Sequence, residues 1–107
     1  MEQNKTIGII GGGISGIFAA KYAKQYGFNY IVYEKSDSLL GIWSDNGYAW
    51  PEMSANVSKF QSSLIDFVWE ETNNIFPTKI EFQVFFNKYI QKYQITNYKL
   101  NSEVVKV

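Results

Sequence analysis

The chain has 107 residues, 46% of them apolar and 18% aromatic, which is enough for one small domain with a hydrophobic core. Ten lysines balance ten acidic residues and arginine is absent, so no net charge recruits nucleic acid or an acidic membrane surface. Histidine and cysteine are absent too, which excludes disulfides, thiolate nucleophiles and imidazole catalysis, and no metal site is expected. No stretch approaches the roughly 20 apolar residues of a membrane-spanning helix, so we expect no transmembrane segment and a cytoplasmic location.

The first 34 residues predict a strand, a glycine turn, a helix and a second strand. Residues 6–11 are rich in β-branched side chains and close on glycine, which indicates a buried strand, and the apolar spacing of 14–26 indicates a helix that ends at Gly27. Residues 28–34 are apolar on both faces, as a parallel strand beneath helices should be. This order is a βαβ unit with a short crossover.

The remaining chain predicts less regular structure. Residues 36–76 are expected to be mostly irregular, with a short helical piece near 58–65. Thr78 and Glu81 have the spacing of a capping box, and the aromatic residues that follow repeat at helical spacing, which predicts a helix. The final stretch "KLNSEVVKV" predicts a strand that reaches the last residue. No linker or repeat divides the chain, so we predict a single, partial α/β domain over residues 1–107, a parallel sheet with flanking helices.

Gly11, Gly13 and Gly16 form the pattern G-x-G-x-x-G between the first predicted strand and helix. In this context the first glycine allows a tight turn, the second lets a diphosphate approach the backbone, and the third lets the helix pack closely on the strand. Without arginine, we expect the phosphates to bind the free amides at the helix N-terminus. Glu34 ends the second strand, close to the ~20 residues expected for the acid that accepts hydrogen bonds from a ribose. An acid there disfavours a 2′-phosphate, so NAD or FAD is predicted rather than NADP.

The segment "YEKSDSLLGIWSDNGYAW" resembles the N-terminal flavin-binding region of flavin-containing monooxygenases, where an acid, a polar stretch, a glycine pair and x-Trp follow the second strand. Gly41 and Trp43 match the second glycine and the tryptophan. Ile42 stands where amine-oxidase-like flavoproteins have an arginine, which argues against that class. The stretches "MSANVSKFQSSLIDF" and "FPTKIEFQVFFNKYI" resemble later parts of the same family, so the resemblance covers nearly the whole chain.

The resemblance implies a Rossmann-like fold and the N-terminal FAD-binding part of an NADPH-dependent flavin monooxygenase. In that family NADPH reduces FAD, oxygen adds to the reduced flavin, and the flavin hydroperoxide oxygenates a soft nitrogen or sulfur nucleophile or a carbonyl. The NADPH site would lie beyond Val107, so the 107 residues alone are not expected to be active. Asn56 is assigned the catalytic position beside the isoalloxazine ring, where it helps hold flavin and nicotinamide in register. The residues assigned to cofactor binding are Gly11, Gly13, Ile14, Ser15, Gly16, Glu34, Lys35, Gly41, Ile42, Trp43 and Asn56.

Two positions depart from the family pattern. Leu40 stands in place of the first glycine of the pair, and Ser58 replaces a proline. If the site binds FAD, we expect Leu40 to have a negative φ and to point away from the cofactor.

Three interpretations therefore stay open. The first is part of a monooxygenase that acts on a small-molecule substrate, and the second is a non-catalytic remnant of the flavoprotein fold that serves as a structural subunit. The third is a plain NAD-binding module, which the Gly41–Trp43 segment disfavours. The sheet is also expected to be covered by the missing remainder of the flavoprotein or by a partner chain.

Overall fold

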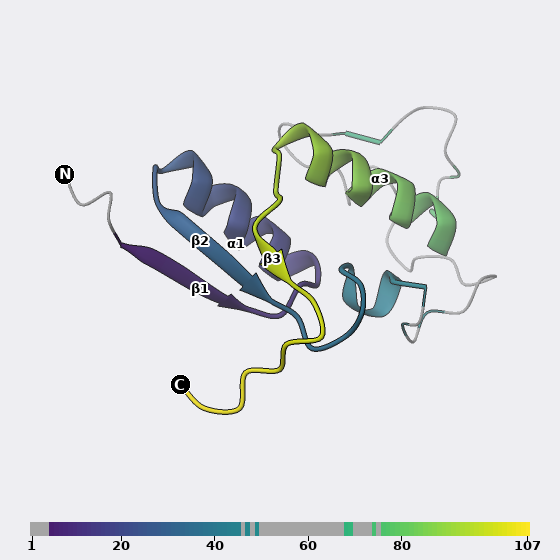
Figure 1. The fold of residues 1–107 in the computed structure, drawn as a ribbon. Helices are drawn as coiled ribbons and strands as arrows, with labels where there is room; N and C mark the ends of the chain where they lie inside the picture. The colour runs from purple at the N-terminus through teal and green to yellow at the C-terminus, as the bar shows by residue number, and fades with distance from the viewer. Residues whose placement is uncertain (1–4, 46, 48, 50–67, 70–73, 75) are drawn as a thin grey trace.

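The centre of the fold is a parallel three-stranded sheet in the order β1-β2-β3 (Figure 1). The computed structural model describes residues 5–45, 47, 49, 68–69, 74 and 76–107. The strands are β1 (Thr6–Ile10), β2 (Asn29–Tyr33) and β3 (Tyr98–Lys99), and the helices are α1 (Ile14–Gln25), the short 3-10 helix η1 (Gly41–Trp43) and α3 (Lys79–Lys92). The predicted βαβ unit and the α/β class are confirmed.

The ends of the two long helices follow from local sequence. Gly27 has φ 81°, and the Phe28 amide behind it donates to the Ala23 carbonyl at 2.9 Å, which ends α1 as the glycine predicted. At the start of α3 both hydrogen bonds of the capping box between Thr78 and Glu81 are present. No helix in the described part of the chain has the length and apolar character needed to cross a membrane.

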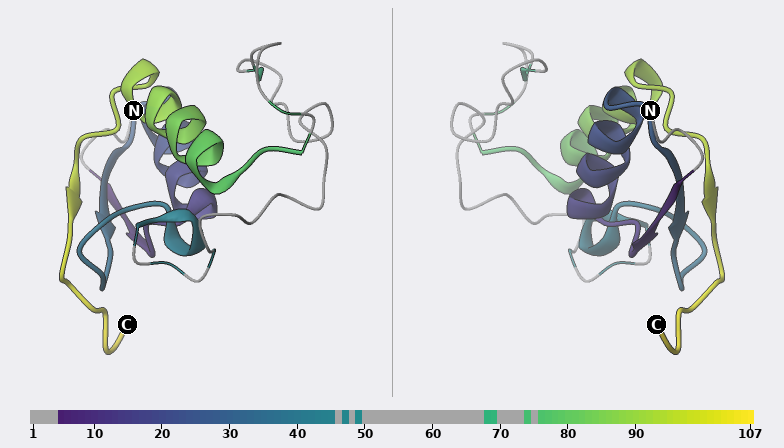
Figure 2. Two further views of the ribbon diagram at one scale, coloured as in Figure 1. Left: turned by 90° about the vertical axis from the view of Figure 1, so that its right-hand side faces the viewer. Right: turned by 90° about the vertical axis from the view of Figure 1, so that its left-hand side faces the viewer.

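Both long helices lie on the same face of the sheet (Figure 2). The ring of Phe18 from α1 lies 6.2 Å from the ring of Phe86 and 5.5 Å from that of Tyr89, so aromatic contacts join α1 to α3. The buried apolar residues of this core include Ile9, Ile17, Ala20, Tyr30, Val32, Leu40, Trp43, Trp69, Phe82, Phe85, Phe86, Tyr89 and Ile95.

The opposite face of the sheet is bare in the described structure. Ile9 points to the helices and is 7% exposed, whereas its neighbour Ile10 points the other way and is 62% exposed. Among the described residues, β1 pairs only with β2, so its outer edge is open. Parallel sheets are normally covered on both faces, so this sheet has an uncovered face and an edge where further chain can add.

The predicted C-terminal strand was largely wrong. It begins at Tyr98, ends at Lys99, and does not continue to the last residue. Asn101 has φ 52° and its amide donates to the Ser36 carbonyl at 2.8 Å, so the chain turns towards the loop after β2 and leaves the sheet. Val105 and Val107 consequently lie in solvent. The helical piece expected near 58–65 lies outside the described residues.

Candidate dinucleotide-binding site

A cavity of about 310 Å³ lies where the turn after β1 meets η1. Every residue that the sequence analysis assigned to cofactor binding lines this cavity, except Glu34, Lys35 and Asn56. Its lining is Ile10, Gly11, Gly13, Ile14, Ser15, Gly16, Leu40, Gly41, Ile42 and Trp43. Two segments separated by more than twenty residues in the sequence therefore form the two walls of one cleft, which we call the cofactor cleft.

The three glycines of the G-x-G-x-x-G pattern are needed for different reasons. Gly11 has φ 98°, a conformation that side chains disfavour. A Cβ on Gly16 would collide with the carbonyl oxygen of Gly11, so this glycine is required by the packing of α1 on the turn. A Cβ on Gly13 would meet nothing nearer than the Gly41 Cα at 3.9 Å, which is ordinary contact. The protein itself therefore tolerates a side chain at Gly13, and only an occupant of the cleft would exclude one.

The N-terminus of α1 opens into the cofactor cleft. Gly13 is its N-cap, no side chain caps the helix, and its first turn carries no acidic residue. The first amides of a helix have no partner within the helix, and the helix dipole places partial positive charge beside them. Ile14, Ser15 and Gly16 supply these amides, and all three line the cleft. Helix N-termini of this kind can bind a diphosphate without arginine.

Glu34 lies beside the cleft and binds the glycine turn to the loop after β2. One carboxylate oxygen accepts from the Gly12 amide at 2.7 Å and the other from the Ser36 amide at 2.8 Å, and the residue is 8% exposed. Burial raises the pKa of the carboxyl, but the hydrogen bonds from Ser36 and Gly12, with the charge of Lys35, outweigh it and hold the pKa below its ordinary value. Lys35 is exposed and does not line the cavity. Glu34 is therefore a charged, pre-ordered hydrogen-bond acceptor.

The expectation for the backbone of Leu40 was wrong. Leu40 has φ 83°, in the left-handed region, and is 5% exposed. Its amide donates to the Gly12 carbonyl at 2.9 Å, and its carbonyl accepts from the Trp43 amide at 3.0 Å as η1 begins. The chain must turn sharply here to bring Gly41 against Gly13, and a left-handed residue makes that turn. Glycine adopts this conformation at no steric cost, whereas leucine is strained.

Trp43 belongs to the core as well as to the cleft. Its ring stacks on that of Phe82 with centroids 4.1 Å apart and an interplanar angle of 14°, and the residue is 8% exposed. Trp43 also lines the cofactor cleft. Trp43 is therefore both a core residue and part of the cleft wall.

Two glycines escaped the sequence analysis, and one predicted residue is not placed. A Cβ on Gly12 would lie 2.5 Å from Leu39 Cδ2, and the Gly12 amide is the donor to Glu34. A Cβ on Gly47 would collide with the carbonyl oxygens of Gly41 and Ile42. The run "GGG" in the sequence already contains Gly12. The need for glycine at position 47 arises because the chain folds back onto Gly41 and Ile42, which only the structure reveals. Asn56 lies outside the described residues.

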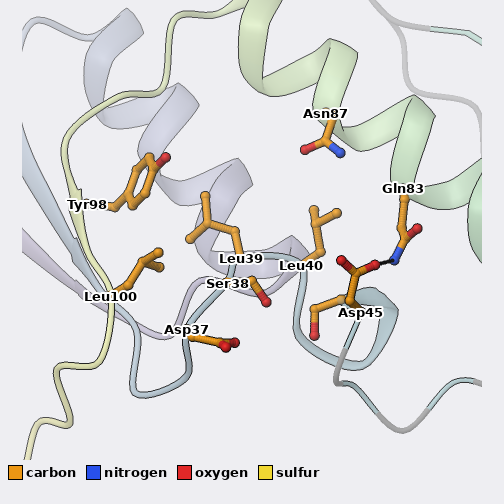
Figure 3. A pocket seen from close by; sticks show the side chains of 10 residues that line it. Asp37, Ser38, Leu39, Leu40, Asp45, Gln83, Asn87, Tyr98 and Leu100 are labelled. Atoms are coloured by element: carbon orange, nitrogen blue, oxygen red, sulfur yellow. Dashed lines mark hydrogen bonds between the residues drawn. The ribbon is translucent and has the colours of Figure 1, made fainter.

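A second cavity, of about 430 Å³, lies between the loop after β2, α3 and β3 (Figure 3). Its lining is mostly polar, with the carboxylates of Asp37 and Asp45 and the amides of Gln83 and Asn87, against the side chains of three leucines and Tyr98. Leu40 is the one residue that it shares with the cofactor cleft among the described lining residues. The left-handed leucine thus stands between the two cavities.

A glycine turn after β1, the open N-terminus of α1 and an acid at the end of β2 are together the features of a Rossmann-like fold. Comparison with known proteins agrees, because residues 9–58 match the family described as NAD(P)-binding Rossmann-like domain. Along its whole length the chain is 28% identical to a protein from Arabidopsis thaliana named as a flavin-containing monooxygenase, and it covers 23% of that protein. The resemblance to the N-terminal part of flavin-containing monooxygenases is therefore confirmed, and the chain spans about a quarter of the length of this relative.

Solved structures share the fold. S-allyl-L-cysteine S-oxygenase from Allium sativum matches 95% of this chain and 29% of its own, with a TM-score of 0.83 and 18% identity. Bacillithiol disulfide reductase from Staphylococcus aureus matches 96% of this chain and 31% of its own, with a TM-score of 0.75 and 23% identity. At these identities the likeness establishes the fold, which an oxygenase and a reductase both use, and the choice of reaction needs further argument.

Proposed function

We propose that this chain is the N-terminal FAD-binding part of an NADPH-dependent flavin monooxygenase that oxygenates soft nitrogen or sulfur nucleophiles or carbonyls. The observation that carries the proposal is the cofactor cleft, in which the glycine turn at the start of α1 faces the Gly41–Trp43 segment. A plain NAD-binding βαβ unit requires the first wall and gives no reason for the second. The relatives named as monooxygenases support the choice of reaction.

In this proposal the chain binds and orients the cofactor. The amides of Ile14 to Gly16 hold the diphosphate, Glu34 accepts hydrogen bonds from the ribose, and Lys35 lies near the same end of the cofactor. Gly41, Ile42 and Trp43 contact the flavin-bearing half, and Asn56 lies beside the isoalloxazine ring. FAD supplies the redox and oxygen chemistry when it is bound, and NADPH binds in a part of the protein beyond this chain.

The fit of the cleft to a dinucleotide can be judged on two positions. Among the described residues Gly13 has no neighbour that forbids a side chain, yet it carries none, and its missing Cβ leaves room in the cleft. The α1 N-terminus has donors without a side-chain cap. A diphosphate explains both features together.

The test is to purify the whole polypeptide that the gene encodes and to record its absorbance spectrum. We expect bound FAD, or tight FAD binding after reconstitution, and no tight binding of NAD in its place. A spectrum without flavin that excess FAD leaves unchanged contradicts the proposal. Tight NAD binding in that same sample favours the plain NAD-binding module.

The non-catalytic alternative is supported by one observation, the buried Leu40 where the family has glycine. In that interpretation the fold is kept as a structural subunit, and the cofactor is lost. Whole polypeptide that folds but takes up neither FAD nor NAD is the outcome that favours it.

The partner of the sheet is part of the same proposal. The bare face around Ile10 and the open edge of β1 are expected to be covered by the remainder of the flavoprotein or by a partner chain. The isolated 107 residues should therefore associate or aggregate, and sedimentation velocity measures this. A monomer with a cooperative melt contradicts the expectation. A cytoplasmic location is also proposed, and cell fractionation tests it.

A further inference from the structure

The first turns of α3 hold the segment that forms the second wall of the cofactor cleft. The Lys79 ammonium donates to the Ala49 carbonyl at 2.6 Å and to the Asp45 carbonyl at 3.3 Å. One turn later the Gln83 side-chain amide donates to the Trp43 carbonyl at 2.8 Å and to the Asp45 carboxylate at 3.0 Å (Figure 3). Two side chains of one helix thus bind segment 41–49 at three residues.

The burial of Lys79 is the unusual part of this arrangement. The residue is 6% exposed, and taking an ammonium group out of water costs free energy unless hydrogen bonds replace the water. Here backbone carbonyls of the segment replace it. The lysine is therefore held in place by segment 41–49, and the segment is in turn held by the lysine.

A ring contact lies between the two polar ones. Phe82 stacks on Trp43, and Lys79, Phe82 and Gln83 stand at positions i, i+3 and i+4, which share one face of a helix. The helix itself is rigidly placed, because its capping box is complete and Phe85 and Phe86 lie in the core. We call these three side chains the α3 clamp. They fix the cleft wall relative to α3, which is itself packed in the core.

We propose that Lys79 and Gln83 are positioning residues for the cofactor, which act by holding Gly41–Trp43 in the conformation that FAD binds. This inference rests on the proposed function for the identity of the cofactor. In the described structure the segment is also anchored by the Leu40 amide, which donates to the Gly12 carbonyl directly before it, and by the buried ring of Trp43. Its remaining hydrogen bonds are mostly internal and run from Trp43 to Leu40, from Ser44 to Gly41, from Gly47 to Ser44 and from Ala49 to Ile42.

The expected effect on FAD affinity follows from the fraction of molecules in which the cleft wall is held in place. If only a fraction of molecules holds the wall in place, the apparent dissociation constant rises by the inverse of that fraction. Removing both hydrogen bonds of Gln83 should lower this fraction enough to weaken FAD binding about tenfold, which corresponds to roughly 1.4 kcal/mol.

The experiment compares Gln83→Ala and Lys79→Met with the matched controls Ile80→Ala and Val84→Ala in the whole polypeptide. Ile80 and Val84 lie on the same turns of α3 but are 64% and 48% exposed. Gln83→Glu adds a variant of equal size that has lost both donors. FAD affinity is measured by flavin fluorescence, and amide hydrogen exchange of segment 41–49 is measured without cofactor.

We expect both clamp variants and Gln83→Glu to bind FAD about tenfold more weakly and to exchange the amides of Trp43, Ser44 and Gly47 faster. Exchange in β1 and β2 should stay at the wild-type rate, which separates loss of the clamp from unfolding. The controls should match wild type in both measurements. If Lys79→Met fails to fold, Gln83→Ala and Gln83→Glu carry the test.

Two results overturn the inference. The first is unchanged exchange in segment 41–49, which means that the clamp does not hold it. The second is faster exchange with unchanged FAD affinity, which means that the held conformation does not matter to the cofactor. If wild type does not bind FAD, the proposed function is refuted. In that case the hydrogen-exchange rates alone decide whether α3 holds the segment.

Discussion

The two walls of the cofactor cleft are built by opposite means. The glycine turn gets its shape from local sequence, since Gly11 adopts φ 98° and Gly16 allows the first turn of α1 to touch the Gly11 carbonyl. The Gly41–Trp43 wall follows Leu40, which has a left-handed conformation, and is held by hydrogen bonds from α3, some forty residues further along the chain. The first wall is therefore shaped by its own glycines, with further hydrogen bonds from Gly11 to Tyr33 and from Gly12 to Glu34, whereas the second also depends on the packing of a distant helix.

The largest expected effect is on the local wall. In Gly16→Ala the new Cβ collides with backbone that cannot move without unpacking α1 from β1. Replacing glycine with alanine in a helix interior normally stabilises the helix by roughly 0.5–1 kcal/mol. Overpacking of this kind costs about 3 kcal/mol or more, so we expect a net loss of stability of at least about 2 kcal/mol. Urea unfolding of the whole polypeptide measures it.

Gly13→Ala is the matched control for that prediction. Its Cβ has room in the protein, so the stability should change by less than about 1 kcal/mol. The cofactor should nevertheless bind more weakly, because the methyl group enters the cleft. Equal losses of stability in the two variants would show that the two glycines do not differ as described here.

The second effect concerns Glu34, which binds the Gly12 amide of the glycine turn. Glu34→Arg should weaken FAD binding more than Glu34→Gln, because it removes the acceptor and adds a bulky cation. Losing a charged hydrogen-bond acceptor should cost roughly 1.5–3 kcal/mol, or about tenfold to a hundredfold in affinity. Equal FAD dissociation constants for wild type and both variants would refute the ribose role and leave Glu34 a structural link.

The structural part of the Glu34 role has its own pH signature. Because folding lowers the pKa of this carboxyl, its contribution to stability is fully present above the ordinary glutamate pKa of about 4.3. The contribution is lost as the pH falls from there through the lower pKa of the folded state. Wild type should therefore be more stable than Glu34→Gln at pH 7, and the difference should vanish in acid. A pH-independent difference in urea midpoints contradicts this.

The same contrast between the walls explains how far the sequence could be interpreted. The βαβ unit, the end of α1 at Gly27 and the capping box of Thr78 and Glu81 are local signals, and each was predicted correctly. The contacts of Lys79 and Gln83 with segment 41–49 were not predicted, because hydrogen bonds between distant residues leave no periodic pattern. The last strand was predicted too long because valines favour strands wherever they occur.

The smallest expected effect is at Leu40, where Leu40→Ala and Leu40→Gly can be compared. Both remove nearly the whole side chain, but they differ in the free energy that the left-handed backbone conformation costs. Leucine here is buried, so Leu40→Ala should destabilise the fold by about 2 kcal/mol, at the low end for buried leucines because the side chain borders two cavities. In most loops glycine is the less stable replacement, since it adds entropy to the unfolded chain. At φ 83° the order should reverse, because the left-handed conformation costs alanine about 1 kcal/mol and glycine almost nothing.

We therefore expect Leu40→Gly to be more stable than Leu40→Ala by about 1 kcal/mol in urea unfolding. Equal stabilities, or a more stable alanine variant, would mean that position 40 does not keep its left-handed conformation in solution. FAD titration of the same proteins addresses the cofactor. We expect wild type and Leu40→Gly to bind FAD alike, because the leucine side chain borders the cleft but is 5% exposed and belongs to the core. A gain of tenfold or more with glycine, about 1.4 kcal/mol, means that leucine obstructs the cofactor and favours the non-catalytic alternative.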